Sequence, residues 1–170
     1  MGLTNIGVFH TIVGIVAIGA ALTSLIKFGK IDLAKLSGRV YLYGTVITSL
    51  TALAISKRGG FNVGHAFSLF IIVVIAIALY LFYKRQASSR SRYIENFLLS
   101  FSLLLSLVPT VNETLTRVPV GSPLAKDISD PVIAKTLLFL LVVFITGSIF
   151  QFIKQRKINM RGLNEVQSLK

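Results

Sequence analysis

Hydrophobic positions along the chain form five long runs that are separated by short polar clusters. The first run, residues 3–26, contains 24 residues without a formal charge. As a helix with a rise of about 1.5 Å per residue it is about 36 Å long, which exceeds the roughly 30 Å hydrocarbon core of a bilayer. We therefore predict an all-α integral membrane bundle of five transmembrane helices, at residues 3–26, 38–56, 61–83, 93–112 and 132–153.

The helices fill one predicted domain, residues 1–153, and a polar, basic tail follows at residues 154–170. Asp130 and Pro131 lie directly before the last run. Aspartate caps a helix by accepting backbone N–H groups, and proline is favoured at the first helical position. This pair predicts that the last helix begins at Pro131.

Composition agrees with a membrane protein, because 54% of the residues are hydrophobic and only 14% are charged. Soluble domains are about 25% charged. A net charge of +12 in a soluble protein would suggest nucleic-acid binding. Here the basic residues lie in clusters between apolar runs, so we predict contact with anionic lipid head groups and no nucleic-acid partner. The absence of cysteine from the sequence excludes disulfides, iron–sulfur clusters and covalently attached haem.

The basic residues divide unequally between the two ends of the predicted bundle. One end has 13 of the 18, and these are Lys27, Lys30, Lys35, Arg39, Lys84, Arg85, Arg90, Arg92, Lys154, Arg156, Lys157, Arg161 and Lys170. The other end has Lys57, Arg58, Arg117, Lys126 and Lys135, together with three acidic residues. Cytoplasmic loops carry the excess of lysine and arginine. We therefore predict that the N-terminus lies outside, and that the basic tail lies in the cytoplasm beside anionic lipids of the inner leaflet.

Five polar residues are expected near one level at the outer end of the bundle. By helical rise His10 lies about 10 Å, and His65 about 6 Å, below the start of its helix. Glu113, with Asn112 and Arg117 beside it, ends the fourth run at the same side. Ionisable groups at membrane depth are candidates for function because their burial is costly.

Several interpretations of this outer polar site remain open. His10 and His65 could ligate a b-type haem, or they could bind a metal ion or relay protons together with Glu113. Glu113 could instead couple proton movement to transport by a small transporter. The last interpretation is structural: His10 bonds a neighbouring helix, His65 lies in the head-group zone, and Glu113 pairs with Arg117 one turn away. The sequence has no nucleophile, Walker or dinucleotide-binding motif. We therefore predict a non-enzymatic protein.

Small residues recur along one face of the first run at Gly7, Gly14, Ala17 and Ala21, in line with His10. Lipid-facing surface gains nothing from small side chains, whereas close helix contact does. This face predicts helix packing within a compact bundle. It also suggests assembly as an accessory subunit of a larger membrane complex.

Short motifs give the chain a family resemblance. Three features carry this resemblance: a histidine early in the first helix, Leu36-Ser37-Gly38-Arg39-Val40-Tyr41 before the second helix, and Gly60-Phe61-Asn62-Val63-Gly64-His65 before the third. With these the chain resembles a family of small bacterial multi-pass membrane proteins of unknown function. The resemblance implies a location in the bacterial cytoplasmic (inner) membrane and implies no activity. Family members often have a further histidine near the start of the fourth helix, where this chain has Tyr93-Ile94-Glu95.

Overall fold

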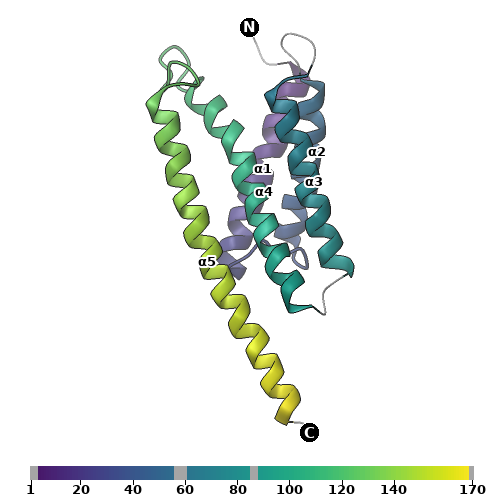
Figure 1. Cartoon of the computed structure of the whole chain (residues 1–170). Coiled ribbons are helices and arrows are strands. Elements are labelled where there is room, and N and C mark those ends of the chain that lie inside the picture. The colour runs from purple at the N-terminus through teal and green to yellow at the C-terminus, as the bar shows by residue number, and fades with distance from the viewer. Residues whose placement is uncertain (1–3, 56–60, 85–87, 169–170) are drawn as a thin grey trace.

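The computed structural model describes residues 4–55, 61–84 and 88–168, and across these the chain folds into five helices (Figure 1). The all-α prediction is confirmed. The helices are α1 (Asn5–Phe28), α2 (Leu36–Ala54), α3 (Val63–Lys84), α4 (Ser89–Leu115) and α5 (Pro131–Ser168). Five positions that entered the charge and motif predictions lie outside the described residues: Lys57, Arg58, Gly60, Arg85 and Lys170.

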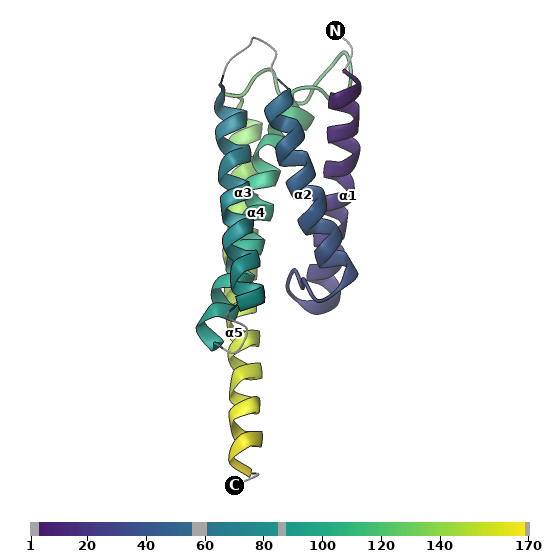
Figure 2. The same cartoon turned by 90° about the vertical axis from the view of Figure 1, so that its right-hand side faces the viewer.

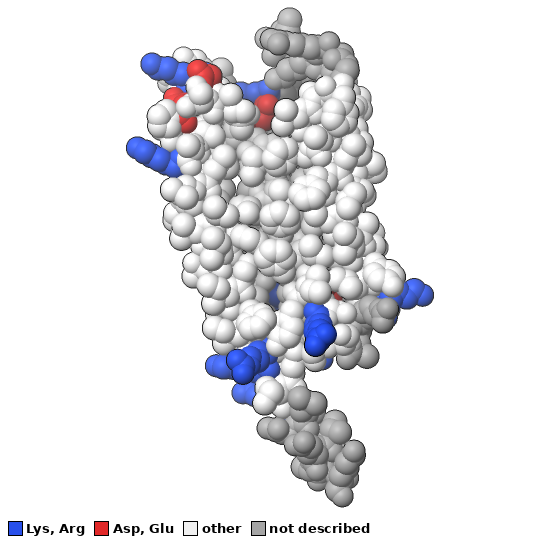
Figure 3. Space-filling view, viewed as in Figure 1, with Lys and Arg blue, Asp and Glu red and all other residues white. Residues whose placement is uncertain are grey.

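The helices run alternately up and down, and each packs against the next along the chain. The start of α1 and the α4–α5 loop lie at one end, called here the N-terminal end of the bundle (Figure 2). The α1–α2 loop and the far end of α5 lie at the opposite, C-terminal end. Charge differs between these ends: one face shows a broad uncharged band between a lower end with mostly lysine and arginine and an upper end with both signs (Figure 3).

Four of the five helices in the described part of the chain are long and apolar enough to cross a membrane: α1, α3, α4 and α5 over Pro131–Arg161. Helix α2 has 19 residues but is less apolar. Its polar residues have a structural reason, because Tyr41, Thr45 and Ser49 are buried inside the bundle. Polar side chains that face neighbouring helices lower the hydropathy of α2.

Two helices are longer than the hydrophobic runs predict. Helix α4 begins at Ser89 because the Ser88 side chain accepts the N–H of Ser91 at the N-cap. Helix α5 begins at Pro131, as predicted, and the Asp130 carboxylate accepts the N–H of Val132. It then continues to Ser168, so most of the expected tail, residues 154–170, is helical. Lysine, glutamine, arginine and methionine in this stretch are good helix formers.

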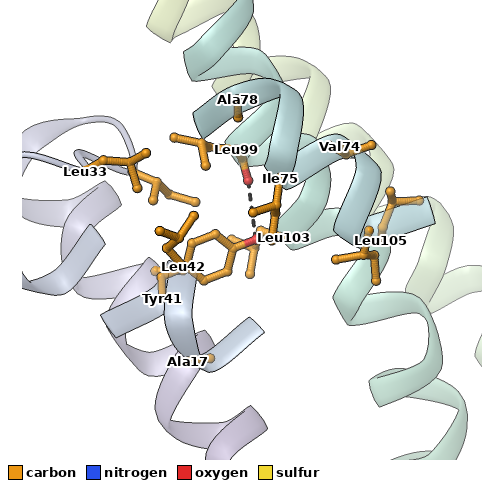
Figure 4. Packing of buried hydrophobic residues seen from close by; sticks show 13 residues of the cluster. Ala17, Leu33, Tyr41, Leu42, Val74, Ile75, Ala78, Leu99, Leu103 and Leu105 are labelled. Atoms are coloured by element: carbon orange, nitrogen blue, oxygen red, sulfur yellow. Dashed lines mark hydrogen bonds between the residues drawn. The ribbon is translucent and has the colours of Figure 1, made fainter. Parts of the chain in front are cut away.

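The core lies between α1, α2, α3 and α4 (Figure 4). Tyr41 is fully buried, and its hydroxyl lies 2.6 Å from Oγ of Ser102 on α4. The small-residue face of α1 packs on α2, as the spacing predicted: a Cβ added to Gly44 would lie 2.8 Å from Cβ of Ala17. Small side chains therefore allow these two backbones to approach closely.

Candidate functional site

The imidazole of His10 contacts the neighbouring helix. Its Nδ1 lies 3.0 Å from Oγ1 of Thr51 on α2. The Thr51 hydroxyl also lies within hydrogen-bond distance of the carbonyl oxygens of Ile47 and Thr48, and when it donates to either of them Oγ1 accepts the Nδ1–H of His10. This tautomer leaves the lone pair of His10 Nε2 free. Such a hydrogen bond at Nδ1 is the arrangement that orients a metal-ligating histidine.

His65 has a different role, at the first turn of α3. Oδ1 of Asn62 accepts the backbone N–H of His65 at 3.1 Å, and Nδ1 of His65 accepts the backbone N–H of Asn62 at 3.3 Å. This reciprocal pair is a capping box, in which a histidine takes the place usually held by glutamate. Because Nδ1 is an acceptor, Nε2 of the neutral ring carries the proton. Nε2 is buried and has no hydrogen-bond partner within the described residues.

Glu113 and Arg117 form an ion pair one helical turn apart at the end of α4. The side chains are 53% and 39% exposed, so this pair lies at the surface. Asn112 helps to end the helix, because its backbone carbonyl accepts the N–H and the hydroxyl of Thr116. The Oδ1 atom of Asn112 is buried without a hydrogen-bond partner in the described part of the chain.

The predicted residues all lie at the N-terminal end of the bundle, but they form three separate contacts. No group of three His, Asp or Glu side chains in residues 4–55, 61–84 and 88–168 lies close enough to hold a metal ion. The contacts of His10 and Glu113 are those of the structural interpretation.

The residues present do not fit a haem held by two histidines. Haem iron needs an imidazole lone pair from each side. His10 offers one at Nε2, but the capping box leaves His65 with a proton at Nε2. An open groove of about 460 Å³ lies beside His10, and its lining excludes both histidines: Asn5, Ile6, Phe9, Leu50, Thr51 and Ala54.

Sequence reasoning missed a second polar cluster, which joins α4 to α5 near the C-terminal end. Ser100 Oγ donates to Oε1 of Gln151 at 3.0 Å, and Asn96 Nδ2 donates to Oε1 of Gln155 at 3.2 Å. All four side chains are buried. The four-residue spacing of Gln151 and Gln155 on α5 was a readable signal, since it places both on one helix face.

The fold defines an α-helical membrane protein with at least four apolar helices among the described residues. Comparisons with protein-family models, curated proteins and solved structures find no match to this chain. The family resemblance of the short motifs therefore stays a prediction.

Proposed function

We propose that the chain is a non-enzymatic integral membrane protein of the bacterial cytoplasmic membrane and an accessory subunit of a larger membrane complex. In this proposal it crosses the membrane five times, with the N-terminus outside and the C-terminus in the cytoplasm. The observation that carries the assembly role is the exposure of α5. In its membrane-spanning stretch 6% of the residues are buried, compared with 39% in α4.

Three features support α2 as the fifth span. Helix α2 is antiparallel to α1 and packs along it (Figure 2). Contacts occur near the N-terminal end of the pair, where His10 lies against Thr51, and at its middle, where Gly44 lies against Ala17. At about 1.5 Å per residue its 19 residues are about 28 Å long, close to the hydrocarbon thickness.

The charge distribution supports the orientation. Lys35 and Lys154 lie at the C-terminal end of the bundle, together with most other lysine and arginine residues of the described chain. Arg117 at the other end is paired with Glu113. Basic residues concentrate on the cytoplasmic side of bacterial membrane proteins.

Cysteine labelling tests the topology, because the natural sequence has no cysteine. Exposed residues flank α2 at Lys35 and Phe61, and Ser122 is exposed in the α4–α5 loop. In intact cells a membrane-impermeant maleimide should label Phe61→Cys and Ser122→Cys, and should label Lys35→Cys only after the cells are opened. Labelling of Lys35→Cys and Phe61→Cys from the same side would show that α2 does not cross.

Photo-crosslinking tests the assembly role. A photoreactive amino acid at Val142, which is 54% exposed on α5, should give a protein adduct in native membranes. The matched control is Val73 on α3, which is 53% exposed. Adducts with lipid alone at both positions would contradict the proposal that α5 binds a partner subunit.

A further inference from the structure

The loop between α4 and α5 displays aliphatic side chains at the N-terminal end of the bundle (Figure 1). Four large aliphatic residues of this loop are more than half exposed: Val118, Val120, Leu124 and Ile128. Single exposed apolar residues are normal on a protein surface. A group of them within one short loop instead marks a surface that contacts protein or lipid.

Backbone hydrogen bonds fold this loop back onto the end of α4. The N–H of Ala125 donates to the carbonyl oxygen of Leu115 at 2.9 Å, and the side chain of Ala125 is buried. The N–H of Leu124 donates to the carbonyl oxygen of Val118 at 3.4 Å, so the backbones of these two aliphatic residues are neighbours. Leu124 therefore lies at about the level of Leu115, although its own side chain is 62% exposed.

The charges of α5 indicate where the hydrocarbon core of the membrane begins. Lys135 and Lys154, both exposed, flank residues 136–153, which carry no formal charge. At about 1.5 Å per residue this stretch is about 27 Å long, close to the roughly 30 Å of hydrocarbon in a bilayer. The boundary at the N-terminal end of the bundle then lies between Lys135 and Thr136.

The register between α4 and α5 places the loop at this boundary. The hydrogen bond between Ser100 and Gln151 aligns the two antiparallel helices. Leu115 is fifteen residues beyond Ser100, and Thr136 is fifteen residues before Gln151, so Leu115 and Thr136 are about level. The head-group layer beyond the hydrocarbon is about 5–8 Å thick on each side. The exposed aliphatic residue beside Ala125 therefore lies at the level of this layer.

The charged groups of the loop fit the same surroundings. The carboxylates of Asp127 and Asp130 accept backbone N–H groups within the loop and at the start of α5. Lys126 and Lys135 have exposed side chains, and neither forms an ion pair within the part of the chain that the structure describes. Free amines attract lipid phosphate, and aliphatic side chains next to them favour the apolar chains below it.

We propose that Val118 and Leu124 insert into the head-group layer of the leaflet at the N-terminal end of the bundle. The α4–α5 loop then lies on the lipid surface and anchors the end of α4 there. Insertion removes aliphatic surface from water, and the hydrogen-bonded loop backbone needs no further ordering. The proposal rests on the proposed function only in that α4 and α5 lie in a membrane.

Single tryptophan residues test the depth of the loop, because the natural sequence contains no tryptophan. The purified full chain is placed in bicelles of phosphatidylcholine and phosphatidylglycerol, which leave both bilayer faces open to aqueous reagents. Leu124→Trp is the test variant, Ser122→Trp is the matched control in the same loop, and Val142→Trp reports the apolar stretch of α5. The quenchers are iodide in the water, phosphatidylcholine with a spin label on its head group, and phosphatidylcholine with brominated acyl chains.

The expected result is a difference between the two loop positions. Leu124→Trp should emit at a shorter wavelength than Ser122→Trp, lose most of the quenching by iodide, and be quenched by the spin-labelled head group. Val142→Trp should be quenched by the brominated chains. If Leu124→Trp does not fold, Val118→Trp should give the result expected for it.

The contrary outcomes separate this inference from the proposed function. If iodide quenches Leu124→Trp as strongly as Ser122→Trp while brominated chains quench Val142→Trp, the inference is overturned, and the aliphatic residues are left for a protein partner. If brominated chains do not quench Val142→Trp, α5 lies outside the bilayer and the proposed function is overturned as well. Bicelles impose no sidedness, so a reversed topology would leave the result standing.

Discussion

Gly38 lies at the start of α2 where no side chain fits. A Cβ added there would lie 2.1 Å from the carbonyl oxygen of Asp32 and 2.9 Å from the backbone nitrogen of Leu33. Ordinary contact begins at 3.4 Å, so alanine requires the loop backbone to move by about 1.3 Å. The loop is held in place, because the Asp32 N–H donates to Oγ of Ser24 at 3.0 Å and its carbonyl accepts the N–H of Lys35 at 2.9 Å.

We expect Gly38→Ala to destabilise the protein by about 2–4 kcal/mol. Overpacking costs about 1–3 kcal/mol, and the two displaced hydrogen bonds contribute about 1 kcal/mol each. The higher helix propensity of alanine offsets up to about 1 kcal/mol of this destabilisation. Gly19 is the matched control, because a Cβ added there meets nothing within 4 Å. Gly19→Ala should leave stability unchanged or raise it by up to about 1 kcal/mol.

The assay is unfolding of the purified protein by SDS in mixed micelles, followed by far-ultraviolet circular dichroism. The free energy of unfolding is compared between the two variants and the wild type. A Gly38→Ala protein as stable as Gly19→Ala would refute the reasoning, because it would show that the α1–α2 loop is not fixed against α2.

Three further predictions concern hydrogen bonds. Tyr41→Phe should lower the free energy of unfolding by about 1 kcal/mol in the same assay. Because the two hydroxyls bond each other, Ser102→Ala should lower it by less in the Tyr41→Phe protein than in the wild type. Fully additive effects of the two substitutions would contradict this. Asn62→Ala should remove the N-terminal cap of α3 and lower the free energy of unfolding by about 1 kcal/mol. An unchanged free energy of unfolding would argue against a capping box. The backbone N–H of Val132 lowers the pKa of Asp130. The stability from this cap is therefore present above the ordinary aspartate pKa of about 3.9 and is lost as the pH falls through the lowered value. In an NMR titration the Val132 amide shift should change with a midpoint below about 3.9, and Asp130→Asn should abolish the change; a midpoint at or above 3.9 would contradict the assignment.

Much of the fold is predictable because the length of an apolar run depends on neighbouring residues alone. The start of α4 was placed four residues late because Ser88 caps a polar turn, which hydropathy does not detect. The end of α5 was missed for a related reason, since charged residues continue a helix as readily as apolar ones. Helix α2 is the reverse case, because its buried Tyr41 and Thr45 make it less apolar than a lipid-exposed span.

The candidate site was predictable in part, because the four-residue spacing of Glu113 and Arg117 predicts their ion pair. Helical rise gives the level of His10 and His65, whereas the partner of each ring depends on helix rotation. One further contact was readable: Asn62 precedes His65 by three residues at the start of an apolar run, which is the spacing of a capping box. The pairing of Asn96 with Gln155 was not readable, because it depends on the register between two helices.

Helix α5 has 38 residues and is therefore about 57 Å long. A bilayer with its head groups is about 40–45 Å thick, so a helix of this length that stands upright in it extends roughly 12–17 Å into the water beyond. Its last turns are then within reach of soluble proteins that never touch the lipid surface. Helix α5 is therefore long enough to reach from a membrane into the aqueous phase.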